Sequence, residues 1–135
     1  ILSAVFSDAS IASADVEAQR KGLKKAMARQ ESMGIQKFEL PKGWNEHINK
    51  KNAELSLTAA AKFNLDKAVS SISYPFLVMT GDHDPNLTSS KDIVSRSASG
   101  NLKILDDVGH GSVLQRPDLV LENFLSWHNL EILES

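Results

Sequence analysis

The chain has 135 residues, of which 41% are hydrophobic and 24% are charged, an ordinary composition for a single globular domain. Its net charge is -2, so there is no basic field to favour nucleic acid as a partner. The absence of cysteine excludes disulfides, thiolate metal ligands and a cysteine nucleophile. No apolar run approaches the roughly 20 residues of a transmembrane helix, and the N-terminus shows no signal-sequence pattern.

The first half of the chain is predicted to contain one strand followed by helices. Ile1 to Phe6 is an apolar run typical of a buried strand. A long helix is expected from about Ala14 to Met33, because Ser13 can cap its start and Gly34 can end it. Two more helices are expected, at about Trp44 to Phe63 and about Leu65 to Ser71.

Strands and helices alternate in the second half. Continuous apolar strands are predicted at about Phe76 to Thr80 and Leu102 to Leu105, with a helix from about Ser89 to Ser97 between them. Pro117 fits the first position of a last helix. This order implies an α/β fold with a parallel sheet and right-handed crossovers. In such sheets ligands bind outside the carboxyl ends of the strands.

Two residues that can take part in catalysis follow these two strands. Asp84 comes directly before Pro85, and His110 lies between two glycines. A histidine can accept a hydroxyl proton near neutral pH, and a carboxylate can hold its tautomer and stabilise its cation. Asp84 and His110 are therefore the predicted acid and base of a nucleophilic triad, with Asp82 as a rival acid.

Each of these residues also has a structural interpretation. An aspartate before proline can simply start a turn, and a loop histidine can simply be exposed. The run Asp82-His83-Asp84 contains metal-ligand types, but neighbouring side chains on an extended chain point apart and zinc usually needs three or four converging ligands. We therefore expect no metal at this run. Ser112 is expected to cap a helix, because no nucleophile elbow surrounds it.

The two strand-and-loop segments resemble the C-terminal half of an α/β-hydrolase. The penultimate core strand of that family commonly reads Pro-x-Leu-x-x-x-Gly-x-x-Asp, which is matched here by Pro75, Leu77, Gly81 and Asp84. Its last core strand is commonly followed by Gly-His and then by Pro and an amphipathic helix, matched here by Gly109, His110 and Pro117.

The resemblance implies a division of the chain and roles for its residues. Residues 1–10 would be a core strand, 11–71 a helical lid or cap, and 72–135 the C-terminal core. Asp84 would be the catalytic acid and His110 the base. The family order is nucleophile, acid, histidine, and no Gly-x-Ser-x-Gly elbow occurs in this chain. The nucleophile, Ser or Asp, is therefore expected upstream of Ile1, on a missing N-terminal half or a companion polypeptide.

The resemblance also implies a function. The expected activity is hydrolysis of an ester or related acyl bond in a small molecule, without a cofactor, and the expected location is the cytoplasm. Two alternatives stay open, a non-catalytic ligand-binding or receptor protein on the same fold and a scaffold that retains triad residues without activity. A fold alone does not decide between them.

Overall fold

A computed structural model describes residues 2–11, 16–35, 37, 40–60, 62 and 65–129. It contains three strands, β1 (Ala4–Ser7), β2 (Phe76–Gly81) and β3 (Gly100–Leu105). The helices are α1 (Val16–Ser32), α2 (Lys50–Ala60), α3 (Leu65–Ser70), α4 (Leu87–Ser95), α5 (Ser112–Gln115) and α6 (Pro117–His128). None of the helices in this described part is long and apolar enough to cross a membrane.

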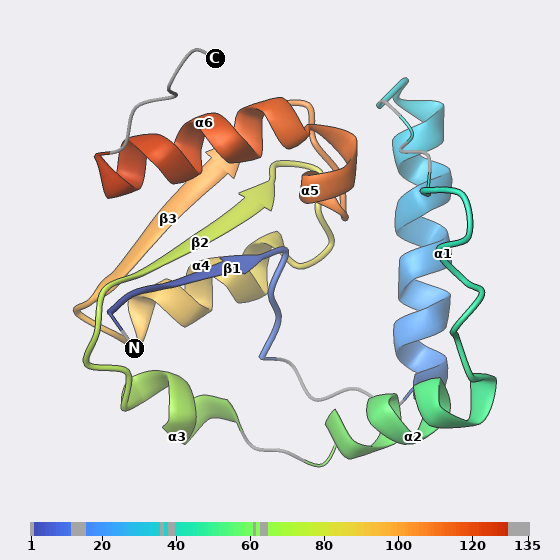
Figure 1. The fold of residues 1–135 in the computed structure, drawn as a ribbon, viewed down its shortest axis with the longest axis horizontal. Coiled ribbons are helices and arrows are strands. Elements are labelled where there is room, and N and C mark those ends of the chain that lie inside the picture. Colours follow the sequence, from blue (N-terminus) through green and yellow to red (C-terminus); the bar gives the residue numbers. More distant parts are fainter. Residues whose placement is uncertain are drawn as a thin grey trace.

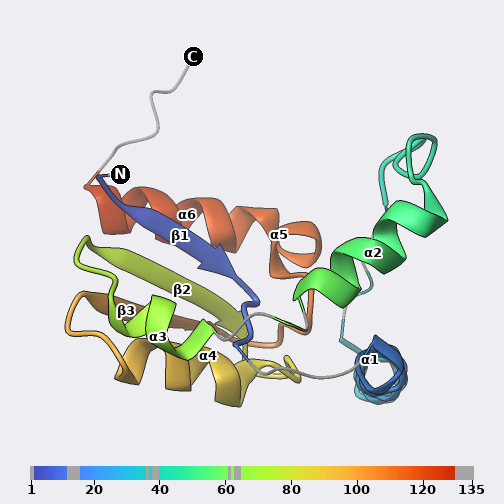
Figure 2. The ribbon, with the colours of Figure 1, turned by 90° about the horizontal axis from the view of Figure 1, so that it is seen from below.

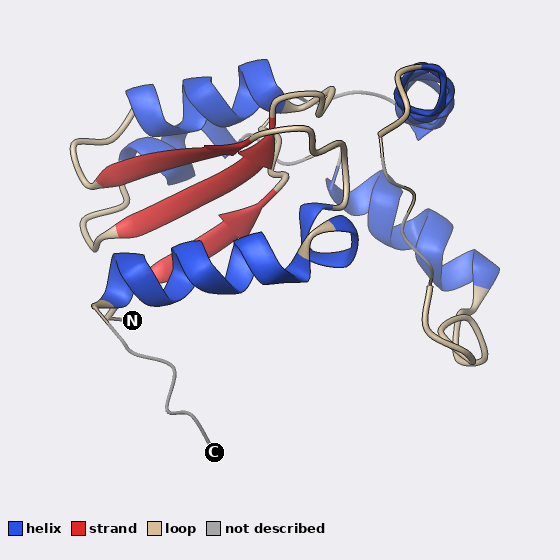
Figure 3. Ribbon diagram, turned by 90° about the horizontal axis from the view of Figure 1, so that it is seen from above, coloured by secondary structure: helices blue, strands red, loops and turns tan. Residues whose placement is uncertain are grey.

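The strands form a parallel sheet in the order β1-β2-β3 (Figure 1). Helices α3 and α4 cover one face, and α5 and α6 cover the other (Figures 2 and 3). The central strand β2 is buried along its whole length, as expected for a parallel strand with both faces covered. One cluster of the apolar core lies between the sheet and the first pair of helices and contains Val69, Phe76, Val78 and Ile93.

The predicted α/β fold with a parallel sheet is confirmed, and most element boundaries move by one to three residues. The largest error concerns α2, which begins at Lys50 and not at Trp44. Residues 42–47 form turns, and the Oδ1 atom of Asn49 accepts hydrogen bonds from the backbone N–H groups of Lys51 (3.0 Å) and Asn52 (3.2 Å). A side chain that satisfies these free N–H groups starts a helix at this point. The predicted cap Ser13 lies outside the described residues.

Helix α1 lies beyond the carboxyl ends of the strands, apart from the layers around the sheet (Figure 1). Its weak apolar stripe leaves side chains such as Met27 (50% exposed) open to solvent. The first strand starts at Ala4, later than predicted, and ends at Ser7. The structure therefore places α1 next to the edge at which ligands of parallel sheets bind, whereas α3 packs on a face of the sheet.

Candidate active site

The geometry at the end of β2 depends on Gly81. A Cβ atom at this position would collide with the backbone carbonyl oxygen of Val108. The loop after β3 therefore passes directly over the end of β2, where His83 N donates to Val108 O (3.0 Å). Only glycine fits at a position where two backbones come this close, because any side chain would have to push the neighbouring backbone away. It brings the residues after β2 next to those after β3.

Asp84 and His110 meet across this junction. The Nδ1 atom of His110 lies 3.2 Å from Oδ1 and 3.4 Å from Oδ2 of Asp84. The predicted approach of these two residues is thus confirmed, while their catalytic roles remain a prediction. The Asp84 side chain is fully buried, and it also accepts hydrogen bonds from Thr80 Oγ1 (3.2 Å) and from Asn86 N (2.7 Å). These donors hold the carboxylate in place. Because Asp84 binds the Nδ1 side of the His110 ring, the Nε2 atom is not engaged by Asp84.

The electrostatics of the pair favour a charged carboxylate and a more basic imidazole. Burial alone would raise the pKa of Asp84, but hydrogen bonds from His110, Asn86 and Asp8 together hold this pKa below its usual range. The hydrogen bond with Asp84 raises the pKa of His110 above its usual range, against the opposing effect of burial. His110 is therefore a stronger proton acceptor than a free histidine side chain.

The rival acid, Asp82, does not contact His110 in this way. Its Oδ1 atom accepts a hydrogen bond from Val108 N (3.2 Å), so it holds the loop after β3 in place. Its Oδ2 atom lies 3.7 Å from Nε2 of His83. Of the two aspartates after β2, the structure thus brings Asp84 to His110 and leaves Asp82 as a support of the loop.

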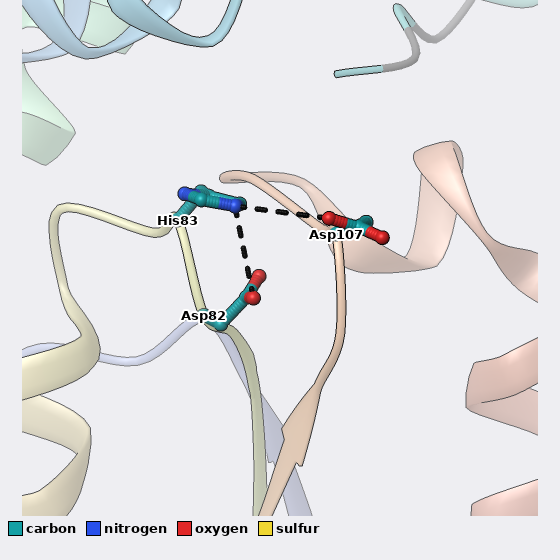
Figure 4. Close-up of side chains that lie close together, drawn as sticks. All are labelled: Asp82, His83 and Asp107. Carbon is teal, nitrogen blue, oxygen red and sulfur yellow. Dashed lines mark ion pairs between the residues drawn. The ribbon is translucent and has the colours of Figure 1, made fainter. Parts of the chain in front are cut away.

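Asp82, His83 and Asp107 form a small cluster on the outer side of this junction (Figure 4). Nε2 of His83 lies 4.0 Å from Oδ1 of Asp107, and one possible ligand atom from each residue lies within 4.8 Å of the others. The expectation that neighbouring side chains point apart is therefore wrong for Asp82 and His83, which face each other. It is right for Asp84, whose side chain faces His110. The two carboxylates flank Nε2 of His83, and the Asp107 side chain is 88% exposed.

Ser112 does not cap a helix as predicted. Gly111 occupies the N-cap position of α5 in the left-handed region (φ 91°), and Ser112 follows it as the first helical residue. The Ser112 side chain is fully buried and donates to Oδ2 of Asp8 (2.9 Å), as does its backbone N–H (2.8 Å). Ser112 therefore binds Asp8, more than a hundred residues away in the chain, in place of a helix end beside it. No local sequence pattern predicts such a contact.

Sequence reasoning missed two buried polar residues of this region. Asp8 exposes 9% of its surface to solvent and Gln30 exposes 7%. Asp8 follows β1 as Asp84 follows β2, so the rule that ligands gather at the carboxyl ends of strands could have identified it. Gln30 lies on α1, and its Nε2 donates to the carbonyl oxygen of His83 (3.2 Å). Nothing in the sequence distinguishes Gln30 from the exposed polar residues of the same helix.

A cleft of about 410 Å³ opens between α1, the segment after it and His110. Apolar side chains form most of its wall, namely Leu23, Met27, Ile35 and Leu40. Polar side chains complete it, namely Gln30, Glu31, Lys37, His110 and Gln115. The ion pair between Lys37 Nζ and Glu31 Oε1 (2.7 Å) belongs to this polar part. A mainly apolar hollow with a few polar groups is the usual form of a small-molecule site.

Comparison with known proteins identifies the fold. No protein-family model and no curated protein matches the chain. Among solved structures, an enol-lactonase from Burkholderia xenovorans LB400 is similar over 96% of this chain (TM-score 0.69, 17% identity). An esterase from Exiguobacterium antarcticum is similar over 95% (TM-score 0.69, 14% identity), and a bromoperoxidase from Bacillus anthracis over 94% (TM-score 0.67, 16% identity).

The fold of the chain is that of the α/β-hydrolases. The chain spans a little over half the length of these structures, covering 56% of the lactonase, 57% of the esterase and 58% of the bromoperoxidase. The recognised fold class therefore matches the expectation from the two sequence motifs.

Proposed function

We propose that this chain carries the acid and the base of a hydrolase that cleaves an ester or related acyl bond. The observation that carries the proposal is the hydrogen bond from Nδ1 of His110 to the buried carboxylate of Asp84, made beside a mainly apolar cleft that His110 itself lines. This is the arrangement in which a carboxylate orients a general base for an activated nucleophile.

In the proposed reaction, a hydroxyl nucleophile from outside this chain attacks the substrate carbonyl carbon. Nε2 of His110 accepts the hydroxyl proton, and Asp84 stabilises the imidazolium that forms. His110 then returns the proton to the leaving alcohol, so that an acyl-enzyme remains. Water, deprotonated by the same nitrogen, releases the acid and restores the nucleophile. The nucleophile and the oxyanion-hole donors would come from a preceding half of the polypeptide or from a companion chain.

The cleft suggests the substrate class and the role of the helices. Apolar side chains of α1 and of the segment after it face a hollow of about 410 Å³, a size suited to a small ester with an apolar acyl or alcohol group. On this basis we assign the lid expected within residues 11–71 to α1 and the segment after it, while α3 packs on the sheet. The esterase and enol-lactonase among the similar structures support acyl chemistry.

The proposal is tested with the complete protein that contains this chain and a series of p-nitrophenyl esters of increasing acyl length. His110→Ala is expected to lower kcat by about 10⁶-fold, because the nucleophile loses its base. The matched control is His47→Ala, since His47 is exposed among turns away from the sheet. Hydrolysis by His110→Ala at the parent rate would exclude His110 as the base. Ester binding without turnover by the parent protein would support the ligand-binding alternative.

A further inference from the structure

Asp8 is a buried acidic residue that the proposed reaction does not use. Its backbone is held on two sides, because Asp8 N donates to Met79 O (2.9 Å) and Asp8 O accepts from Asn86 Nδ2 (3.0 Å). Its φ of 52° lies in the left-handed region, which aspartate and asparagine tolerate better than most residues. The end of β1 is therefore fixed against both β2 and the loop that carries Asp84.

The two oxygens of the Asp8 carboxyl have different surroundings. Oδ2 accepts hydrogen bonds from Ser7 Oγ (2.9 Å), Ser112 N (2.8 Å) and Ser112 Oγ (2.9 Å). Oδ1 is buried and receives no hydrogen bond from the described side chains and backbone. Asn86 joins Asp8 to the other buried carboxyl, because its Nδ2 donates to Asp8 O (3.0 Å) and its backbone N donates to Asp84 Oδ1 (2.7 Å), and each carboxyl shifts the pKa of the other.

The surroundings shift the pKa values of the two carboxyls in opposite directions. Burial and the neighbouring Asp84 raise the pKa of Asp8, and the bonds from Ser112 and Ser7 only partly oppose this. Asp84 has the opposite shift, because His110 and Asn86 stabilise its charge. Asp8 therefore binds a proton more readily than a free carboxyl, and Asp84 binds one less readily. At higher pH the negative charge of Asp8 adds to that of Asp84 and favours the cationic form of His110.

We propose that Asp8 is a positioning residue that completes a chain Asp8–Asp84–His110 and sets the basicity of His110. This inference rests on the proposed function of the Asp84–His110 pair. The ionisable groups that act on Asp8 among the described residues are Asp84 from the loop after β2 and His110 from the loop after β3. Its remaining side-chain partners, Ser7 and Ser112, are neutral. Asp8 thus joins the end of β1 to the pair formed at the ends of β2 and β3.

The test is a ¹⁵N NMR titration of the His110 ring in the complete protein, with Asp8→Asn as the main variant. Asparagine keeps an oxygen that accepts from Ser112, but it removes the charge. The His110 titration midpoint is expected to fall by about one pH unit. The acid limb of kcat/KM should move to lower pH by the same amount, because the base must be neutral to act.

Asp107→Asn is the matched control. Asp107 is an exposed carboxylate in the same loop as His110, and it also has a positive φ (57°), which asparagine accommodates. It should leave the His110 midpoint within about 0.2 pH unit of the parent value, because solvent screens an exposed charge. A His110 midpoint that is unchanged in a folded Asp8→Asn protein would reduce Asp8 to a purely structural role and overturn the proposal.

A measurement on the parent protein keeps the test valid if Asp8→Asn does not fold. The carboxyl ¹³C signals of Asp8 and Asp84 should titrate with two midpoints shared by both residues, since their protonation is coupled. Independent single midpoints would contradict the proposal. These NMR titrations do not require turnover, so a protein that shows the His110 shift but cleaves no ester would refute the proposed function and leave the coupling intact.

Discussion

At the residue scale, the site depends on hydrogen bonds that converge on one buried carboxylate. Asp84 accepts from the hydroxyl of Thr80 in β2, from the backbone N–H of Asn86 before α4 and from the ring of His110 after β3. A buried carboxylate is costly unless such donors satisfy it. The same donors keep Asp84 negatively charged beside His110. The hydrogen bonds that offset the cost of burying this carboxylate are therefore also the ones that its proposed catalytic role requires.

The acid of this pair should control both the rate and its pH dependence. In the complete protein, Asp84→Asn is expected to lower kcat/KM by about 10⁴-fold, because asparagine can favour the wrong tautomer of His110. The pKa of His110 is raised chiefly by its hydrogen bond with Asp84, so the variant should lower it. The residual activity should therefore persist to lower pH than the parent activity. A pH–rate profile measures this, and an acid limb that stays in place would contradict the assigned pairing.

The close approach at Gly81 should make this position intolerant of a side chain. Gly81→Ala is expected to lower the free energy of unfolding by about 1–3 kcal/mol, because the added Cβ must displace the Val108 backbone. Urea denaturation measures the change. Gly22→Ala is the control, since a Cβ at Gly22 meets no atom within 4 Å and alanine favours a helix interior. Equal stability of the parent protein and Gly81→Ala would contradict the described packing.

At the scale of elements, α1 is the helix that closes over the site while packing weakly against the rest. Gln30 links it to the loops after β2 and β3, through its hydrogen bond to His83 O and its contact with Gly109. A salt bridge between Arg20 and Glu54 (3.7 Å) links it to α2, but both side chains are about half exposed and such pairs contribute little. Few buried contacts hold α1, so it is expected to open more readily than the sheet.

Removing the Gln30 side chain should release α1 without disturbing the sheet. Gln30→Ala is expected to speed amide hydrogen exchange in α1 by about 5–10-fold, the effect of losing one hydrogen bond of about 1 kcal/mol. Exchange in β2 should not change. Hydrogen exchange with mass spectrometry makes the measurement, and Lys21→Ala, an exposed position on the same helix, is the control. Faster exchange that includes β2 would indicate general destabilisation and contradict a local role.

At the scale of the whole molecule, the sheet has open edges. Among the described residues β1 pairs only with β2, so its other edge has unpaired backbone N–H and C=O groups. Next to this edge, a mainly apolar groove of about 370 Å³ is lined by residues of β1, β2, α5 and α6 such as Val5, Met79, Val113 and Leu121. An unpaired edge beside apolar surface favours pairing with another chain or with a further part of the same fold.

The chain should therefore not be a well-behaved isolated monomer. Sedimentation of the 135-residue chain at micromolar concentration is expected to show self-association, and addition of a polypeptide that carries the nucleophile should give a defined complex instead. The expected cause is completion of the sheet at the β1 edge. A stable monomer with cooperative unfolding would show that the chain has a closed core of its own. It would count heavily against its being half of a hydrolase.

The alternation of strands and helices and the two loops that carry Asp84 and His110 could be predicted from the amino-acid sequence. These features are encoded locally, since an apolar run, a glycine or a proline acts on its immediate neighbours. The motif around Gly81 was recognisable, although its cause, the passage of the Val108 backbone over β2, is visible only in the fold. The start of α2 was misjudged because one side chain, Asn49, fixes it.

The folded structure excludes the rival Asp82 by bringing Asp84 to His110, and it alone reveals that Asp8 and Gln30 belong to the same region. Asp8 and Ser112 are more than a hundred residues apart and become neighbours because β1 lies beside β2 in a parallel sheet. Gln30 reaches the loop after β2 because α1 lies beyond the carboxyl ends of the strands. These contacts depend on how distant elements pack against one another, and the packing of distant elements leaves no periodic or local pattern in a single sequence.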